Sequence, residues 1–123
     1  MNTANLKKTR DYLAEHPDQY DQANWMRPCG TPSCVAGYAV AVCGGTLLDE
    51  ERCLTSDGDN WYLPVYAQEL LGLDFDQRED MFSAAPYDSF EPVTATEALA
   101  MLDWAIDRDE VRWPPRRTED TQT

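Results

Sequence analysis

The least polar run of this charge-rich chain covers residues 32–43, whose side chains are small or apolar all the way around a helix. Thr31 has the character of an N-cap, Pro32 of a first helical residue, and Gly44 and Gly45 of a helix stop. A helix without a polar face is typical of a buried position. At about twelve residues it is too short to cross a bilayer, which takes roughly twenty. We therefore expect a buried central helix in this segment.

Apolar residues at helical spacing predict further helices on both sides of this core. The first covers residues 4–15 and ends before Pro17, because the residue before a proline disfavours helix. A shorter helix is expected between Pro64, which suits a first helical turn, and Gly72, which suits a helix end.

Two capping-box patterns predict the starts of two more helices. Residues 74–77 open a short helix that we expect to bury Phe75, Met81 and Phe82. Residues 94–97 open the last helix, which runs to about residue 108 and has an apolar face at helical spacing.

The remaining pattern lies in residues 52–63, where the turn-forming residues 56–60 are flanked by short runs with strand character. We expect a minor β-hairpin at this place. The fold class is therefore mainly α, a small single-domain bundle of four to five helices around the central helix. A chain of 123 residues supports one domain. We place that domain at residues 1–108 and expect a flexible C-terminal tail over residues 109–123.

Charge changes the picture of function. The formal net charge is −13, and residues 49–91 carry twelve acidic against two basic side chains. This balance disfavours direct binding to nucleic acid or to an anionic membrane, and it favours a partner with a basic surface. The polar residues 1–10 do not resemble a secretory signal, so we expect a cytoplasmic protein with reduced thiols.

The acidic segment also contains aromatic residues, a combination typical of protein interfaces. We therefore predict a small, non-enzymatic protein-binding module without a cofactor, whose binding face lies within residues 49–91. Exposed carboxylates would attract the partner over long range, and buried aromatic rings would slow its dissociation. The acidic residues are Asp49, Glu50, Glu51, Asp57 and Asp59, and the aromatic anchors are Trp61 and Tyr62.

Cysteines leave two alternatives open. Cys34 at the third position of the expected helix would have a stabilised thiolate, and His16, the only histidine, could serve as its base in a hydrolase or transferase. A structural zinc site is the other alternative, because thiolates and imidazole are zinc ligands. Its ligands would be Cys29, Cys34, Cys53 and His16.

The segment Cys-Gly-Thr-x-x-Cys-x-x-Gly-x-Ala, preceded by a helix and a tryptophan, resembles a set of small proteins common in actinobacterial phages and in some bacteria. The residues that carry this structural motif are Trp25, Cys29, Gly30, Thr31, Cys34 and Gly37. The resemblance implies a shared fold and a phage context, but no reaction. If the binding module is phage-encoded, we expect it to act on a host factor in the host cytoplasm. This chain has Tyr38 where the set often has histidine, which weakens a metal or catalytic role at that position.

Overall fold

The computed structural model describes residues 1–22, 34–49, 52–83, 86–87 and 91–116. This part of the chain is mainly helical with a small antiparallel sheet, which confirms the predicted fold class in outline. The helices are α1 (Thr3–Glu15), α2 (Val35–Val42), α3 (Leu63–Leu71), α4 (Phe75–Met81) and α5 (Ala95–Arg108), with a short 3-10 turn at Pro17–Gln19. The strands are β1 (Thr46–Leu47), β2 (Arg52–Leu54) and β3 (Asn60–Tyr62).

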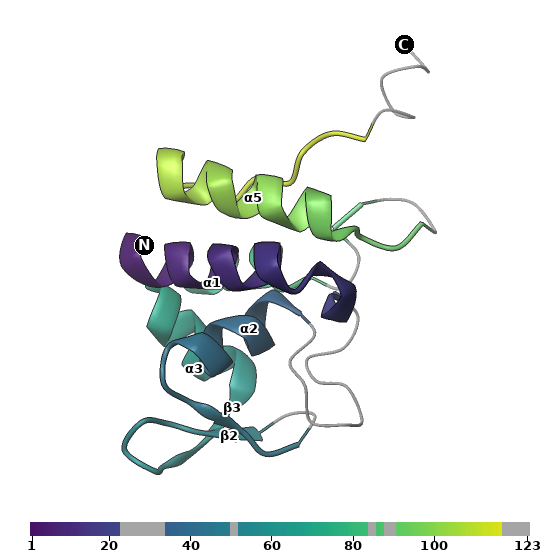
Figure 1. Ribbon diagram of the computed structural model, residues 1–123. Helices are drawn as coiled ribbons and strands as arrows, with labels where there is room; N and C mark the ends of the chain where they lie inside the picture. The colour runs from purple at the N-terminus through teal and green to yellow at the C-terminus, as the bar shows by residue number, and fades with distance from the viewer. Residues whose placement is uncertain (23–33, 50–51, 84–85, 88–90, 117–123) are drawn as a thin grey trace.

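These elements are stacked in the order α5, α1, α2 with α3, and finally the sheet. Figure 1 shows α5 and α1 side by side at the top and the strands below α2 and α3. The sheet has the order β1-β2-β3, so the predicted hairpin of β2 and β3 is extended by one more strand. Within the described ranges, no helix is long and apolar enough to span a membrane.

Helix α2 begins later than the sequence predicts. Its N-cap is Cys34, which has extended backbone angles and no side-chain capping bond, and the first helical residue is Val35. The predicted start at Pro32 with Thr31 as N-cap falls on residues that lie outside the described ranges. The expected helix end is confirmed, because the helical residues stop at Val42.

Most other helix ends are where the sequence places them. Gly72 ends α3 in the left-handed conformation, with φ of 67°. A side-chain carbon at this position would lie 2.9 Å from the backbone nitrogen of Asn2, so the close approach of the N-terminus also requires glycine. Both capping boxes are confirmed: the carboxylate of Asp74 accepts from the Gln77 N–H, and the hydroxyl of Thr94 accepts from the Glu97 N–H.

Helix α4 buries fewer residues than expected. Met81 is fully buried and Phe82 is half-buried, but Phe75 is 59% exposed. The prediction that Phe75 lies in the core is wrong, because it is the first residue of the helix and its ring lies under the Arg78 guanidinium, 4.7 Å away. A cation–π contact of this kind is formed at the surface.

The chain after α5 packs against the domain, whereas the sequence predicts a flexible tail from residue 109. Val111 and Trp113 pack against the core, and Arg116 is buried. The indole N–H of Trp113 also donates to the carbonyl of Asp80 at 2.9 Å. The packed domain thus includes residues 109–116, called the C-terminal segment below, and residues 117–123 lie outside the described ranges.

Candidate functional site

The register of the sheet determines which side chains face outward. Antiparallel pairing aligns Thr46 with Leu54 and Leu54 with Asn60, and it aligns Arg52 with Tyr62. Residues aligned across the strands in this way form a row. The N–H of Leu48 donates to the carbonyl of Arg52 at 3.0 Å, so Leu48, just beyond β1, joins the row of Arg52 and Tyr62. Because side chains alternate between the faces of a strand, these two rows share one face. The row between them, Leu47, Cys53 and Trp61, is on the other face.

The inner face packs on the helices. Cys53 is fully buried, and Trp61 makes an edge-to-face contact with Tyr66 of α3 at 5.5 Å between ring centroids. Trp61 and Leu47 are half-buried and pack against the core. Cys53 and Trp61 are therefore structural residues of the domain.

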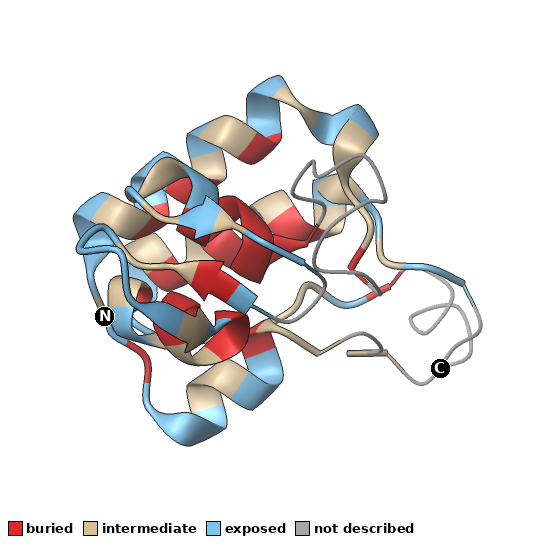
Figure 2. Ribbon diagram, turned by 90° about the horizontal axis from the view of Figure 1, so that it is seen from below, coloured by how far each residue is buried: buried red, intermediate tan, exposed pale blue. Residues whose placement is uncertain are grey.

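The opposite side, the outer sheet face, is turned to the viewer in Figure 2. It presents Thr46, Leu48, Arg52, Leu54, Asn60 and Tyr62. Leu48 is 45% and Tyr62 is 41% exposed, and they are the two large apolar side chains at the ends of one row with Arg52 between them. The Arg52 Nε–H donates to Asn60 Oδ1 at 2.9 Å, which orients the guanidinium on this face.

Carboxylates flank the outer sheet face at both of its ends. Asp49 is exposed directly after Leu48, and its Oδ1 accepts from the Arg52 backbone N–H at 2.9 Å. Asp57 and Asp59 are exposed in the turn between β2 and β3, where their backbone N–H groups donate to the Thr55 hydroxyl. A positively charged partner would meet acidic side chains on either side of the apolar row.

The predicted binding residues are thus divided by the structure. Tyr62 and the three aspartates are exposed around one face, whereas Trp61 points to the core side of the same strand. Glu50 and Glu51 lie outside the described residues. Sequence reasoning missed Leu48 and Arg52. The signal that identifies them is the strand register, which becomes visible only when the pairing partners are known.

Cys34 and His16 do not have the properties of a nucleophile and its base. Cys34 is 1% exposed, and burial raises the pKa of its thiol to about 12 even though backbone N–H groups of Gly37 and Ala36 oppose this shift. The imidazole of His16 stacks on Tyr12 at 4.2 Å, and its Nδ1 lies 3.1 Å from the Tyr12 carbonyl oxygen. At neutral pH the thiol is protonated, which opposes nucleophilic attack.

The predicted zinc site and the predicted structural motif are each described only in part. Where the chain is described, no group of three or more histidine, cysteine or acidic side chains could hold a metal ion, so His16, Cys34 and Cys53 do not converge. Cys29 lies outside the described residues, as do Trp25, Gly30 and Thr31 of the structural motif. The two motif residues that are described, Cys34 and Gly37, are buried at the start of α2.

Further acidic side chains, together with Arg108, line an open cleft of about 570 Å³ between α4 and the end of α5. Asp74, Asp76 and Asp80 contribute from one side, and Asp109 and Glu110 from the other. This cleft extends the negative surface of the protein beyond the sheet.

Comparison of the chain with protein-family models, curated proteins and solved structures gives no match. The outer sheet face is characterised by its own residues: an exposed tyrosine and leucine, one arginine, and carboxylates at both ends. Tyrosine and arginine are enriched at the centres of protein interfaces, where they contribute most of the binding free energy. The arrangement is typical of a protein-binding surface.

Proposed function

We propose that this protein is a small acidic, non-enzymatic protein-binding module whose binding surface is the outer sheet face. The observation that carries the proposal is the row Leu48, Arg52 and Tyr62, which presents two exposed apolar side chains and an arginine on one face of the sheet. The inner face packs against α2 and α3, which hold the sheet in place. Such preorganisation lowers the entropy cost of binding.

The partner of this surface has a basic patch surrounding an apolar centre. Residues 49–91 have a net charge of −10, from twelve acidic and two basic side chains. Exposed charges act mainly on the association rate and its dependence on salt, whereas the buried centre of an interface acts on dissociation. Asp49, Asp57 and Asp59 therefore accelerate the encounter, and Leu48 and Tyr62 hold the complex.

The resemblance of the segment around Cys34 to small phage proteins supports one further step. We propose that the module is phage-encoded and that its partner is a host factor in the host cytoplasm. In this proposal α2 is the structural centre of the bundle. Support comes from its buried residues 35–40 and from its contacts with α1, α3 and β1.

The test is affinity capture with matched surface variants, followed by binding kinetics with the captured protein. Tyr62→Ala removes the aromatic ring from the outer sheet face. Phe75→Ala removes another exposed ring, which lies on α4 and not on the sheet. We expect Tyr62→Ala to lose a partner that Phe75→Ala retains, while both variants keep the circular-dichroism spectrum of the unmodified protein.

Two results would contradict the proposal. The first is a partner retained in full by the double variant Leu48→Ser/Tyr62→Ala, because both exposed apolar side chains of the row would then be dispensable. The second is an association rate that does not change, at low salt, when Asp57 and Asp59 are both replaced by asparagine. In that case the acidic turn would serve only to solvate the surface.

A further inference from the structure

A second surface lies at the other end of the stack of layers from the outer sheet face. It is a small apolar groove of about 270 Å³ between α5 and the C-terminal segment. Figure 1 shows α5 at the top of the molecule and the sheet at the bottom, so the two surfaces are separate. The α5 groove is lined by Ala100, Trp104, Arg112, Trp113, Pro114 and Pro115.

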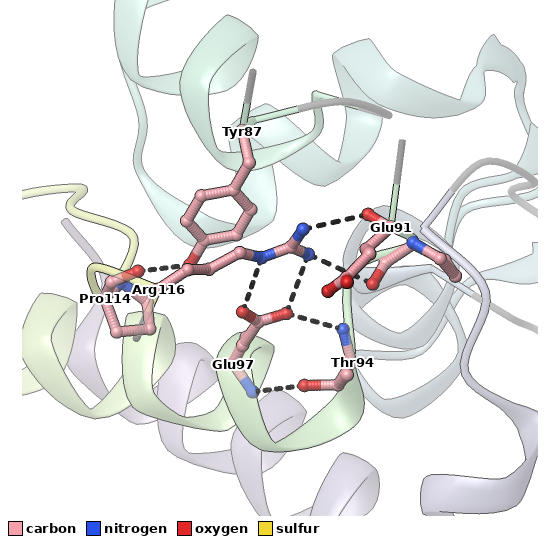
Figure 3. A network of polar contacts seen from close by, with 7 residues as sticks. Tyr87, Glu91, Thr94, Glu97, Pro114 and Arg116 are labelled. Carbon is pink, nitrogen blue, oxygen red and sulfur yellow. Dashed lines mark hydrogen bonds and ion pairs between the residues drawn. The ribbon is translucent and has the colours of Figure 1, made fainter. Parts of the chain in front are cut away.

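The wall formed by the C-terminal segment is fixed at three points. The Trp113 indole N–H donates to the carbonyl of Asp80 at 2.9 Å, and the hydroxyl of Tyr87 donates to the carbonyl of Pro114. Beyond the groove, Arg116 forms an ion pair with Glu97 at the start of α5, with 2.8 Å between Nε and Oε2 (Figure 3). Two prolines add stiffness to the backbone between these points. The groove is therefore present before any ligand enters.

Trp104 forms the other wall of the groove, and two arginine side chains lie over its ring. Its indole N–H donates to the Glu110 carboxylate at 2.8 Å, so the polar end of the ring is satisfied. The guanidinium groups of Arg108 and Arg112 lie 4.6 and 5.0 Å from the ring centroid. Of these two arginines only Arg112 lines the groove.

Arg112 supplies a positive charge that forms no ion pair within the described part of the chain. The nearby carboxylates have other partners: Asp107 pairs with Arg108 at 3.1 Å, and Glu110 accepts from the Trp104 indole. No carboxylate in the described ranges lies within ion-pair distance of Arg112. An arginine held against an aromatic ring keeps its donors directed outward, and carboxylate is the group that a guanidinium binds best.

We propose that the α5 groove binds a small organic carboxylate with one apolar ring. The ring would lie against Trp104 and the two prolines, and the carboxylate would pair with Arg112. The volume suits a single ring, since pockets for drug-sized ligands begin at roughly 300 Å³. The distant negative charges of the protein do not prevent this, because exposed charges more than about 8–10 Å away are largely screened at physiological ionic strength. The nearby Glu110 carboxylate is held at the indole N–H edge of the Trp104 ring.

The experiment uses the full chain labelled with nitrogen-15 and follows the indole N–H resonances during titration. Phenylacetate is the probe, and the neutral phenylacetamide, of the same shape, is its control. We expect phenylacetate to shift the Trp104 and Trp113 resonances with saturation, and phenylacetamide to bind roughly tenfold more weakly, because a charged hydrogen bond is lost.

Two variants separate the charge of Arg112 from a general charge effect. Arg112→Gln should weaken phenylacetate binding about tenfold and leave phenylacetamide unchanged. Arg108→Gln is the matched control, because Arg108 lies on the same ring but outside the groove. It should leave both titrations unchanged.

The proposal is overturned if phenylacetate produces no saturable shift, if the two probes bind equally, or if Arg108→Gln weakens phenylacetate as much as Arg112→Gln does. It is also overturned if the indole resonances move on dilution without a probe and sedimentation shows a dimer, since the groove would then be occupied by a second copy. Arg112 and Arg108 are both exposed, so the variants are expected to fold, and unchanged backbone spectra verify this.

Discussion

Glu97 and Arg116 form a two-pronged ion pair that joins the first turn of α5 to the C-terminal segment. The Arg116 Nε lies 2.8 Å from one carboxylate oxygen of Glu97, and its Nη2 lies 3.1 Å from the other (Figure 3). The same carboxylate accepts from the Thr94 N–H at 2.9 Å and completes the capping box. The guanidinium also donates to the carbonyls of Glu91 and Pro92. This pair of side chains therefore completes the capping box of α5 and joins two positions that are nineteen residues apart in the chain.

Replacing Arg116 should loosen this attachment. Arg116→Ala leaves the half-buried Glu97 carboxylate and two backbone carbonyls without their donor, and Arg116→Lys supplies one donor group in place of the planar fork. We expect the melting temperature to fall most for alanine, less for lysine, and least for the exposed control Arg112→Ala. Thermal unfolding followed by circular dichroism measures the order. An alanine variant as stable as the control would contradict it.

Acid should weaken the protein through the same carboxylate. Partial burial by itself raises the pKa of Glu97, but hydrogen bonds from Arg116 and Thr94 outweigh it and hold the pKa below its ordinary value. A carboxyl group with a lower pKa in the folded state stabilises the fold above its unfolded pKa of about 4.3, and this contribution is lost as the pH falls through the folded pKa.

The variant Glu97→Gln separates this contribution from general acid unfolding. It should be less stable than the unmodified protein near pH 7 and should lose less stability between about pH 5 and pH 3, because the titrating group is absent. Urea unfolding across this range measures the difference, and Glu69→Gln at an exposed position of α3 is the control. Parallel pH curves for Glu97→Gln and the unmodified protein would show that the ion pair is not linked to proton binding.

The Cys34 thiol should be unreactive in the folded protein. Burial raises its pKa to about 12, so at about pH 8 the thiolate is scarce and iodoacetamide has no access to it. Cys43 is half-buried at the end of α2 and should react faster, which provides an internal control. Mass spectrometry of the labelled peptides, before and after denaturation, measures both sites. Rapid labelling of Cys34 at about pH 6 would instead favour the cysteine-dependent enzyme.

Because of the same Cys34 thiol, we expect the free energy of unfolding to fall at alkaline pH. A group with a higher pKa in the folded state favours the unfolded chain once the pH exceeds the unfolded value of about 8.5. The free energy of unfolding should therefore fall as the pH rises above about 8.5. In the Cys34→Ala variant it should fall less, because the titrating thiol is absent.

Helix ends were predictable because the interactions that make them are local. The capping boxes at Asp74 and Thr94 join residues three positions apart, so the sequence pattern contains both partners. Gly72 likewise adopts a backbone conformation that few other residues tolerate.

The candidate surface depends on partners that are distant in the chain. Trp61 and Tyr62 are adjacent and both aromatic, and only the pairing of β3 with β2 determines which of them faces the core. Arg116 similarly pairs with Glu97, nineteen positions earlier at the start of α5, and nothing in the local sequence marks the arginine as buried. The packing of Val111, Trp113 and Arg116 against the domain was for this reason not predicted from the sequence.

The opposite orientations of Trp61 and Tyr62 give the last prediction. Trp61 packs on Tyr66 inside the domain, so Trp61→Ala should lower the free energy of unfolding by about 2 kcal/mol or more. Tyr62 is 41% exposed, so Tyr62→Ala should cost less than about 1 kcal/mol and should instead accelerate dissociation of the partner by tenfold or more.

Urea unfolding and surface-plasmon kinetics on the same samples distinguish these effects. Trp61→Phe is the control that keeps an aromatic ring against Tyr66 and should retain the partner. If Trp61→Phe remains folded but loses the partner while Tyr62→Ala retains it, the binding surface is not the outer sheet face. The side of the strand that carries Trp61 would then have to become accessible on binding, which requires the sheet to separate from α3.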